Sequence, residues 1–195
     1  MVRPRLHTDE QLLDAADAVL ARVGSARFTL ELAAQEAGVS APTLVKRFGS
    51  KRAVLIASSQ RWVDSIEVDP PVDARESALD ALRRLSVGSY ADSDQIEHAA
   101  GHVSSLAMDL GDPELTRLLA LGWERKRQQL AGAISRVIDA GELPRTLEAT
   151  AAARTLFALL EGTFLAWTVA PDGSLTKILD DEFDRLTTTW KRGTP

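Results

Sequence analysis

Hydrophobic residues recur every three to four positions along almost the whole chain, which is the spacing of one face of an α-helix. No stretch alternates hydrophobic and polar residues as a half-buried strand does. The pattern therefore predicts an all-α protein of about nine helices. The predicted segments are 8–24, 30–37, 41–48, 51–67, 73–90, 93–111, 112–141, 146–170 and 175–190.

Capping residues and glycines mark the ends of these segments. Thr8 with Gln11 forms a capping-box pattern at the first helix, and Gly24 is expected to end that helix. In the sixth segment, the residues spaced for one buried face are Ile96, Ala100, Val103, Ala107 and Leu110. Side-chain caps are expected at Thr8, Thr29, Ser40, Ser50, Asp73, Ser93, Asp112, Thr146 and Ser174.

The segments 30–37 and 41–48 are short and are separated only by Gly38-Val39-Ser40. Two helices joined by a tight turn containing glycine are typical of a helix-turn-helix, whose second helix enters the DNA major groove. Between residues 40 and 52 the chain has four basic side chains and no acidic one. A helix N-terminus beside clustered cations suits a phosphate backbone. The four cations are Lys46, Arg47, Lys51 and Arg52.

The sequence Val68-Asp69-Pro70-Pro71 is the clearest linker in the chain. It suggests a helix-turn-helix domain over 1–50, a connecting helix over 51–67 and a helical domain over 73–195. A short basic arm with Arg3 and Arg5 precedes the first helix, and such arms can contact phosphates or the minor groove.

Composition narrows the class of protein. The chain has 195 residues, of which 45% are hydrophobic and 26% charged, and it has no cysteine, which excludes disulfides and thiolate metal sites. The net charge of −5 is unevenly distributed, because residues 1–67 sum to +1 and residues 68–195 to −6. Because no stretch has the hydrophobic length of a membrane span or secretory signal, we expect a cytoplasmic protein without membrane contact.

The N-terminal region resembles the TetR family of bacterial transcription regulators over about residues 8–60. The resemblance rests on Phe28-Thr29, Ala34-Gln35-Glu36-Ala37-Gly38-Val39-Ser40, Thr43-Leu44, Phe48, Ser50-Lys51 and Ala53-Val54-Leu55. It implies an N-terminal three-helix DNA-binding domain followed by a helical ligand-binding and dimerisation domain. The sequence departs from the family where Gly-Thr-Leu-Tyr is usual, because it has Pro42-Thr43-Leu44-Val45. Val45 cannot bond a phosphate as that tyrosine does, but it could contact a thymine methyl.

Within the motif, the resemblance implies that Thr29 and Lys51 contact phosphates at helix N-termini. The residues implied to face bases are Ala41, Pro42, Thr43, Val45 and Arg47. Lys46 suits either role, and Ser40, at the start of the second helix, completes the predicted DNA-binding set.

The resemblance further implies a small-molecule effector pocket among the fourth to eighth helices, and a homodimer through the last two helices. The candidate ligand residues are Trp62, Tyr90, His102, Trp123 and Phe164. The four aromatic residues are alternatively ordinary core residues, and His102 alternatively belongs to an exposed polar face. The predicted function is a repressor released from a pseudo-palindromic double-stranded operator by a small apolar effector. The alternative is a helical protein-binding adaptor with a degenerate helix-turn-helix, which the Val45 substitution favours.

The sequence gives little support for a metal site or for catalysis. Asp94, His98 and His102 are spaced to share a helix face, but no second segment supplies a further ligand, so we predict a polar face and no metal. No nucleophile elbow, phosphate loop or His-Glu-x-x-His motif is present. We therefore expect neither an enzyme nor a cofactor.

Overall fold

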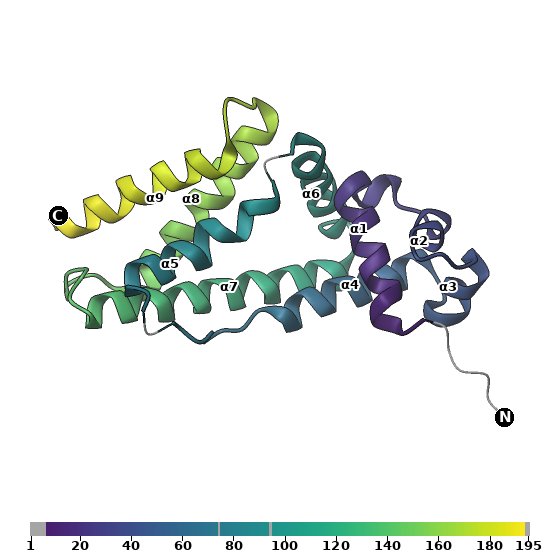
Figure 1. The fold of residues 1–195 in the computed structure, drawn as a ribbon, viewed down its shortest axis with the longest axis horizontal. Coiled ribbons are helices and arrows are strands. Elements are labelled where there is room, and N and C mark those ends of the chain that lie inside the picture. Colours follow the sequence, from purple (N-terminus) through teal and green to yellow (C-terminus); the bar gives the residue numbers. More distant parts are fainter. Residues whose placement is uncertain (1–6, 74, 94, 194–195) are drawn as a thin grey trace. The chain divides into compact units, whose positions relative to one another are not determined.

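The structure is a computed structural model that describes residues 7–73, 75–93 and 95–193. These residues form nine α-helices and one 3₁₀ segment, and they contain no strand, which confirms the all-α prediction (Figure 1). The elements are α1 (Asp9–Arg27), α2 (Leu30–Glu36), α3 (Ala41–Phe48), α4 (Lys51–Ser65), α5 (Ala78–Ser86), η1 (Val87–Ser93), α6 (Ile96–Asp109), α7 (Pro113–Asp139), α8 (Ala149–Val169) and α9 (Leu175–Arg192).

The chain divides into two compact units. The first unit comprises the residues up to Ser65 together with Ala100–Leu121, and the second comprises Ile66–Ala99 together with the residues from Gly122 onwards. The first unit thus contains the C-terminal part of α6 and the start of α7 in addition to α1 to α4. The predicted arm with Arg3 and Arg5 lies outside the described residues.

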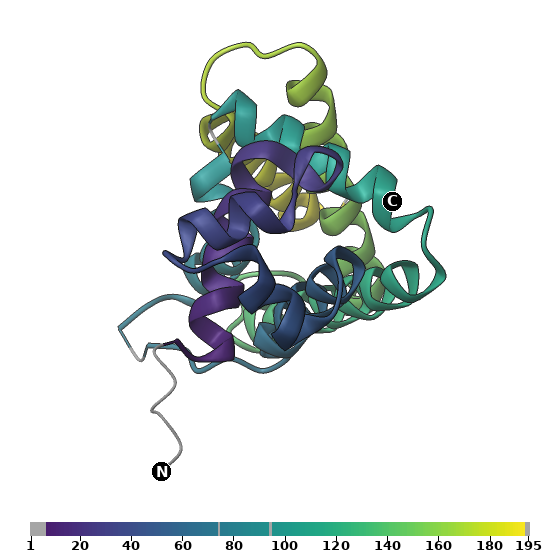
Figure 2. The ribbon, with the colours of Figure 1, turned by 90° about the vertical axis from the view of Figure 1, so that its right-hand side faces the viewer.

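In the first unit, α1, α2, α3 and α4 surround one hydrophobic core (Figure 2). Val19, Phe28, Ala33 and Leu44 are fully buried there, and Leu115 from the start of α7 belongs to the same core. The predicted capping box is present, because the Thr8 amide donates to Gln11 at 2.9 Å and the Gln11 amide donates to Thr8 at 3.2 Å. These contacts fix the start of α1 and the packing that supports the helix-turn-helix.

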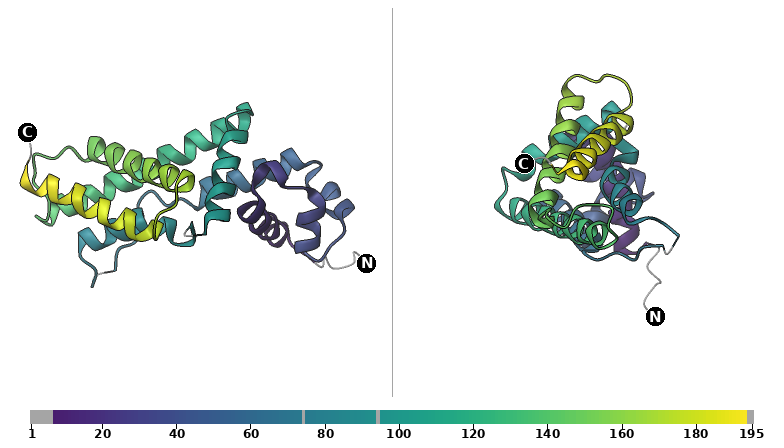
Figure 3. Two further views of the ribbon diagram at one scale, coloured as in Figure 1. Left: turned by 90° about the horizontal axis from the view of Figure 1, so that it is seen from above. Right: turned by 90° about the vertical axis from the view of Figure 1, so that its left-hand side faces the viewer.

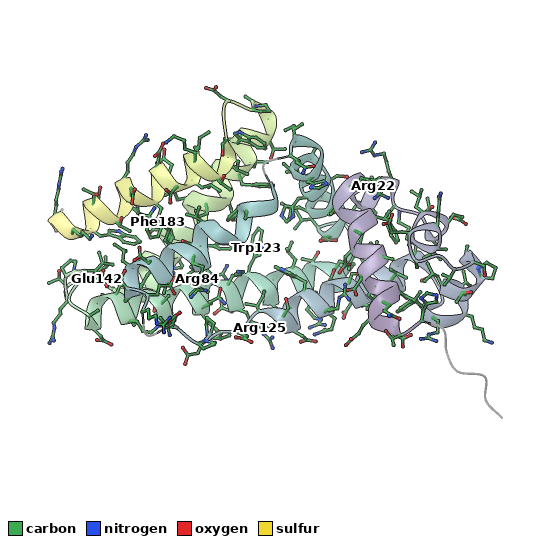
Figure 4. All side chains as sticks on the ribbon, in the orientation of Figure 1. Arg22, Arg84, Trp123, Arg125, Glu142 and Phe183 are labelled. Carbon is green, nitrogen blue, oxygen red and sulfur yellow. The ribbon has the colours of Figure 1, made fainter. Side chains whose placement is uncertain are left out.

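In the second unit, α8 and α9 lie side by side, and η1 packs against both α5 and α9 (Figures 1 and 3). Phe183 of α9 is fully buried on the side that faces α5, and the Arg83 guanidinium lies 4.7 Å from its ring centroid (Figure 4). Arg83 also pairs with Asp180 and Asp184, which ties α5 to α9.

Several predicted helix boundaries were wrong. Asp73 does not cap α5, because its carboxylate accepts the Arg75 amide in a separate turn and Ser77 caps the helix instead. The helix ends at Ser86, whose hydroxyl donates to Leu82 O at 2.7 Å, and the chain then tightens into η1. Glu148, and not Thr146, caps α8.

Two further expectations about helix ends were also wrong, whereas the one for Gly24 is confirmed. Gly24 ends the regular part of α1, because its φ of +71° and ψ of 164° are not helical, and a short second helical segment then extends to Arg27. The sixth helix begins at Ile96, and not directly after Ser93. Ser40 makes no side-chain cap to α3, because its hydroxyl lies 3.0 Å from the Thr43 hydroxyl. The caps at Thr29, Ser50, Asp112 and Ser174 are confirmed.

The predicted buried face of the sixth helix was wrong as well. Ala100 and Ala107 are exposed, and Leu110 is 63% exposed. The helix instead packs on α1 through small residues, Gly101 and Ser105. A hydrophobic periodicity could not identify this contact, because glycine and serine contribute no hydrophobic signal.

Candidate functional site

The corner between α2 and α3 is built from backbone contacts that a glycine permits. Gly38 has a φ of +66°, a left-handed conformation that a Cβ would penalise. The amide of Val39 donates to Ala34 O at 2.9 Å, which closes the end of α2. Leu44 is fully buried and Phe48 is half-buried, so these two side chains anchor α3 on the core.

The opposite face of α3 is open to solvent. Pro42 and Lys46 are exposed, and 47% of Val45 is exposed, whereas Ala41 and Thr43 are half-buried. These residues come from successive turns of one helix and therefore form a continuous surface. We call Pro42, Val45 and Lys46 the exposed α3 surface.

The four cations of this region differ in what they contact. Arg47 pairs with Asp9, Lys51 bonds a backbone carbonyl, and Arg52 pairs with Asp112. Lys46 has no hydrogen bond or ion pair to another residue in the described part of the chain. The cluster that the sequence presents as one basic edge is therefore mostly engaged within the protein.

Lys51 lies against the end of α1. Its Nζ donates to Ser25 O at 2.8 Å and lies 5.9 Å from the centroid of the Phe28 ring. A cation at a helix C-terminus stabilises the exposed carbonyls there. Thr29 caps α2 by accepting the Leu32 amide at 3.2 Å and is itself exposed. The predicted phosphate contacts of Lys51 and Thr29 stay predictions.

Arg52 and Asp112 join α4 to the start of α7 by two hydrogen bonds of 2.5 and 2.9 Å. The Arg52 guanidinium, together with the amides of Leu115 and Glu114, lowers the pKa of Asp112 to about 2. Burial, and then the charge of Asp112, raises the pKa of Asp109 to about 6. The two carboxyl groups therefore titrate on opposite sides of the ordinary aspartate range.

Sequence analysis missed a close contact between α1 and α6. The hydroxyl of Ser25 donates to the Ser105 hydroxyl at 2.8 Å. A Cβ placed on Gly101 would lie only 2.9 Å from Ala21 O, so the two helices touch through backbone atoms. A glycine inside a predicted helix was the available signal, because such a residue commonly marks close packing.

The five predicted ligand residues fall into different units. Trp62, which is 38% exposed, and His102, also exposed, belong to the first unit, whereas Tyr90, Trp123 and Phe164 belong to the second. In the second unit, the rings of Tyr90 and Phe164 lie 5.7 Å apart. Two of the five residues are thus in direct contact.

Glu161, which sequence analysis did not select, is the polar centre of this region. The hydroxyl of Tyr90 donates to it at 2.8 Å. Burial, together with the negative charge of Glu161, raises the pKa of Tyr90 well above its usual range. Burial lowers the pKa of Lys126, while the charge of Glu161 opposes that shift. A carboxylate, a phenol and an ammonium are therefore gathered on α7, α8 and η1.

Aromatic side chains flank these polar groups. Trp123 of α7, labelled in Figure 4, meets the ring of Phe157 edge-on at a centroid distance of 5.6 Å. The Arg127 guanidinium lies 5.7 Å from the centroid of the same Phe157 ring. Phe157, Glu161 and Phe164 are spaced at i, i+4 and i+7 along α8, which places them on neighbouring turns. We call Tyr90, Trp123, Phe157, Glu161 and Phe164 the aromatic–carboxylate cluster.

Two hollows in the described surface lie elsewhere. One is lined by Pro71, Asp73, Arg75, Glu76 and Arg84, and the other by Arg22, Leu32, Gln35 and Glu36. Neither includes a predicted ligand residue. Asp94 lies outside the described residues, and among those described no group of three or more His, Asp or Glu is arranged to hold a metal ion.

Comparison with known families agrees with this architecture. The family model described as "Bacterial regulatory proteins, tetR family" matches residues 12–57. The family model "BetI-type transcriptional repressor, C-terminal" matches residues 78–187. The second match covers more than half of the chain. No helix formed by the described residues is both long and apolar enough to cross a membrane.

Individual proteins are similar as well. The HTH-type transcriptional regulator BetI of Serratia proteamaculans is 30% identical over 162 residues, covering 80% of this chain and 78% of that protein. SmeT, the repressor of the Stenotrophomonas maltophilia multidrug efflux pump SmeDEF, has a TM-score of 0.69 at 23% identity, covering 95% of this chain and 91% of SmeT. A putative transcriptional regulator from Saccharomonospora viridis in complex with choline has a TM-score of 0.73 at 21% identity, covering 92% and 94%.

The two solved structures show a similar fold only, because their sequence identities are low. The two family models and the BetI relative, in contrast, match the sequence itself. These sequence matches confirm the resemblance seen in the helix-turn-helix and also identify the family of the C-terminal region. The chain belongs to the TetR family of bacterial transcriptional regulators, and its C-terminal region is of the BetI repressor type.

Proposed function

We propose that this regulator represses transcription by binding a pseudo-palindromic operator as a homodimer, with α3 of each copy in the major groove. The observation that supports this most is the exposed α3 surface, held on a buried core directly after the α2–α3 corner. Phosphate contacts would come from Thr29, Ser40 and Lys46, and base contacts from Pro42 and Val45 with Ala41 and Thr43 beside them.

The test is selection of duplexes from a random-sequence pool by the full-length protein, followed by measurement of affinity for the enriched duplex. We expect enrichment of two inverted half-sites separated by about one helical turn, because a two-fold dimer presents two α3 helices. Val45→Ser should weaken binding to the enriched duplex and change the preferred half-site. Enrichment of no sequence by the wild type would contradict the proposal.

For the dimer, the exposed side of α8 is the favoured interface together with α9. Leu165 is 48% exposed and Val169 is 79% exposed on α8, which is more hydrophobic surface than a solvent-facing helix needs. Leu165→Glu should shift sedimentation from dimer to monomer. Leu110→Glu, at another exposed leucine, should leave the dimer intact. A monomeric wild type would refute this interface.

For the effector, we place the site at the aromatic–carboxylate cluster and expect a small molecule with a mainly nonpolar surface. Aromatic rings beside a carboxylate favour an organic cation through cation–π and charge interactions. The complex of the Saccharomonospora viridis regulator with choline makes quaternary ammonium compounds the first class to test. Binding there would displace the Tyr90 hydroxyl from Glu161 and favour a conformer that does not fit the operator.

Titration calorimetry with choline tests this assignment. Glu161→Gln should weaken choline binding by about tenfold or more, because a partly buried charge partner is lost. Glu142→Gln is the matched control, since Glu142 also accepts a hydrogen bond in the second unit, from the Leu79 amide. Heat of binding absent from the wild type, or equal in both variants, would show that the assignment is wrong.

The alternative is an adaptor that binds protein through the nonpolar part of α3, which the exposure of Val45 favours. It predicts no enrichment of DNA and is decided by the same selection. As a regulator of the chromosome, the protein is expected to act in the cytoplasm and to catalyse no reaction.

A further inference from the structure

Arg47 of α3 faces the start of α1 and not the open side of its own helix. Its Nε and one terminal nitrogen both reach Oδ1 of Asp9, and the terminal nitrogen also lies 3.3 Å from His7 O. Only 19% of the Arg47 side chain is exposed, compared with 60% of the Asp9 side chain. The first turn of α1 lies beside α3 in Figure 1, as these contacts require.

This arrangement opposes a direct role for Arg47 in base contact. To reach a base, the guanidinium would have to leave both acceptors, and the Asp9 carboxylate would then stand unpaired near DNA phosphates. Asp9 is also held in place by the N-terminus of α1, where an acidic side chain is favoured. Lys46, the neighbouring cation, is exposed and needs to break no such contact.

The Arg47–Asp9 pair also stabilises the last turn of α3. The helix has only eight residues, and Ser40 provides no side-chain cap at its start. Helices this short are stable only through tertiary contacts. Leu44 and Phe48 supply the hydrophobic part, and the Arg47–Asp9 pair supplies the polar contact that orients the helix about its axis.

We propose that Arg47 is a positioning residue, which holds α3 against α1 through Asp9, and that the exposed α3 surface determines operator specificity. The proposal rests on the proposed function, in which α3 enters the major groove. The paired guanidinium stays on Asp9 when DNA is bound. Pro42, Val45 and Lys46 then face the groove in one fixed orientation.

The experiment measures the affinity of the full-length protein for the duplex enriched from the random pool, at several salt concentrations. The variants are Asp9→Asn, Arg47→Gln and the double substitution, which has the net charge of the wild type. Arg22→Ala is the matched control, because Arg22 forms an ion pair of 3.0 Å between α1 and α2 in the same unit. Lys46→Ala reports a direct contact. Circular dichroism verifies that each variant is folded.

We expect Asp9→Asn and Arg47→Gln each to weaken binding by about three- to tenfold, with the double substitution no weaker than the worse single one. The slope of log affinity against log salt should stay unchanged in these three variants. In Lys46→Ala its magnitude should fall by about 1.8, because the dimer loses one phosphate contact in each copy. Arg22→Ala should change affinity by less than about twofold.

Asp9→Asn is the decisive variant, because the two explanations predict opposite effects on DNA affinity. Loss of a negative charge near DNA would by itself tighten binding, whereas loss of the Arg47 partner should weaken it. Tighter or unchanged binding by Asp9→Asn, or a reduced salt slope in Arg47→Gln, would overturn the positioning role while wild-type binding remained intact. If the proposed function itself is wrong, the wild type will bind no duplex. That result differs from the ones above, and it would overturn the positioning role as well.

Discussion

The close contact of α1 with α6 predicts the effect of one methyl group. Gly101 lies within α6, and its backbone touches α1 at Gly24 and Ala21. A Cβ at position 101 would lie 2.9 Å from Ala21 O and 3.4 Å from Gly24 N. Both neighbours are backbone atoms, which cannot move aside as a flexible side chain can. Gly101→Ala should therefore push α6 away from α1.

The magnitude follows from two destabilising contributions and one stabilising contribution. Overpacking of this kind costs about 1–3 kcal/mol. Replacement of glycine by alanine inside a helix returns about 1 kcal/mol. Displacement of α6 would also lengthen the hydrogen bond of 2.8 Å between Ser25 and Ser105, and such a bond contributes about 1 kcal/mol. The expected net loss of unfolding free energy is about 1–3 kcal/mol.

Urea unfolding followed by circular dichroism measures this loss, at one protein concentration because dimerisation changes the apparent stability. Gly132→Ala in α7 is the matched control, since a Cβ there would meet no atom within 4 Å. It should stabilise the protein by about 0.5–1 kcal/mol. If Gly101→Ala were as stable as the wild type or more stable, the α1–α6 contact described here would be wrong.

Three further predictions concern stability. The pKa of Asp112 is lowered to about 2, so its carboxylate stabilises the folded state fully above about pH 4, and this stabilisation is lost as the pH falls toward 2. In thermal melts, the difference in stability between the wild type and Asp112→Asn should therefore shrink between about pH 4 and pH 2. The pKa of Asp109 is raised to about 6, so its ionisation destabilises the folded state increasingly as the pH rises from 4 to 6. Asp109→Asn should raise the free energy of unfolding, measured with urea at pH 7.5, by about 1 kcal/mol after screening, and should have no effect below pH 4. Phe183 is fully buried, so Phe183→Ala should cost about 3–5 kcal/mol, and a loss below about 1 kcal/mol in urea unfolding would contradict its place in the core.

The α1–α6 contact and the Arg52–Asp112 pair bear on how the regulator is organised. Both connect the helix-turn-helix core to residues from 100 to 121, far along the chain. The compact unit that contains α3 therefore includes the end of α6 and the start of α7.

The sequence by itself determined the helices, the α2–α3 corner and the family. These features depend on neighbours within about one helical turn, as in the Thr8–Gln11 capping box and the left-handed Gly38. Where two local signals competed, the sequence was ambiguous. Asp73 and Ser77 can both begin a helix, and only the surrounding structure selects Ser77.

Only the tertiary structure decided what the charged side chains do. Arg47, Lys51 and Arg52 look alike in sequence, but their partners lie 38, 26 and 60 residues away, beyond any local pattern. The position of Glu161 beside Tyr90, 71 residues earlier, is equally nonlocal. Side-chain periodicity predicts the buried face of a helix only where that face is hydrophobic, which fails for α6, and the partner of a buried or half-buried charge depends on how distant helices pack.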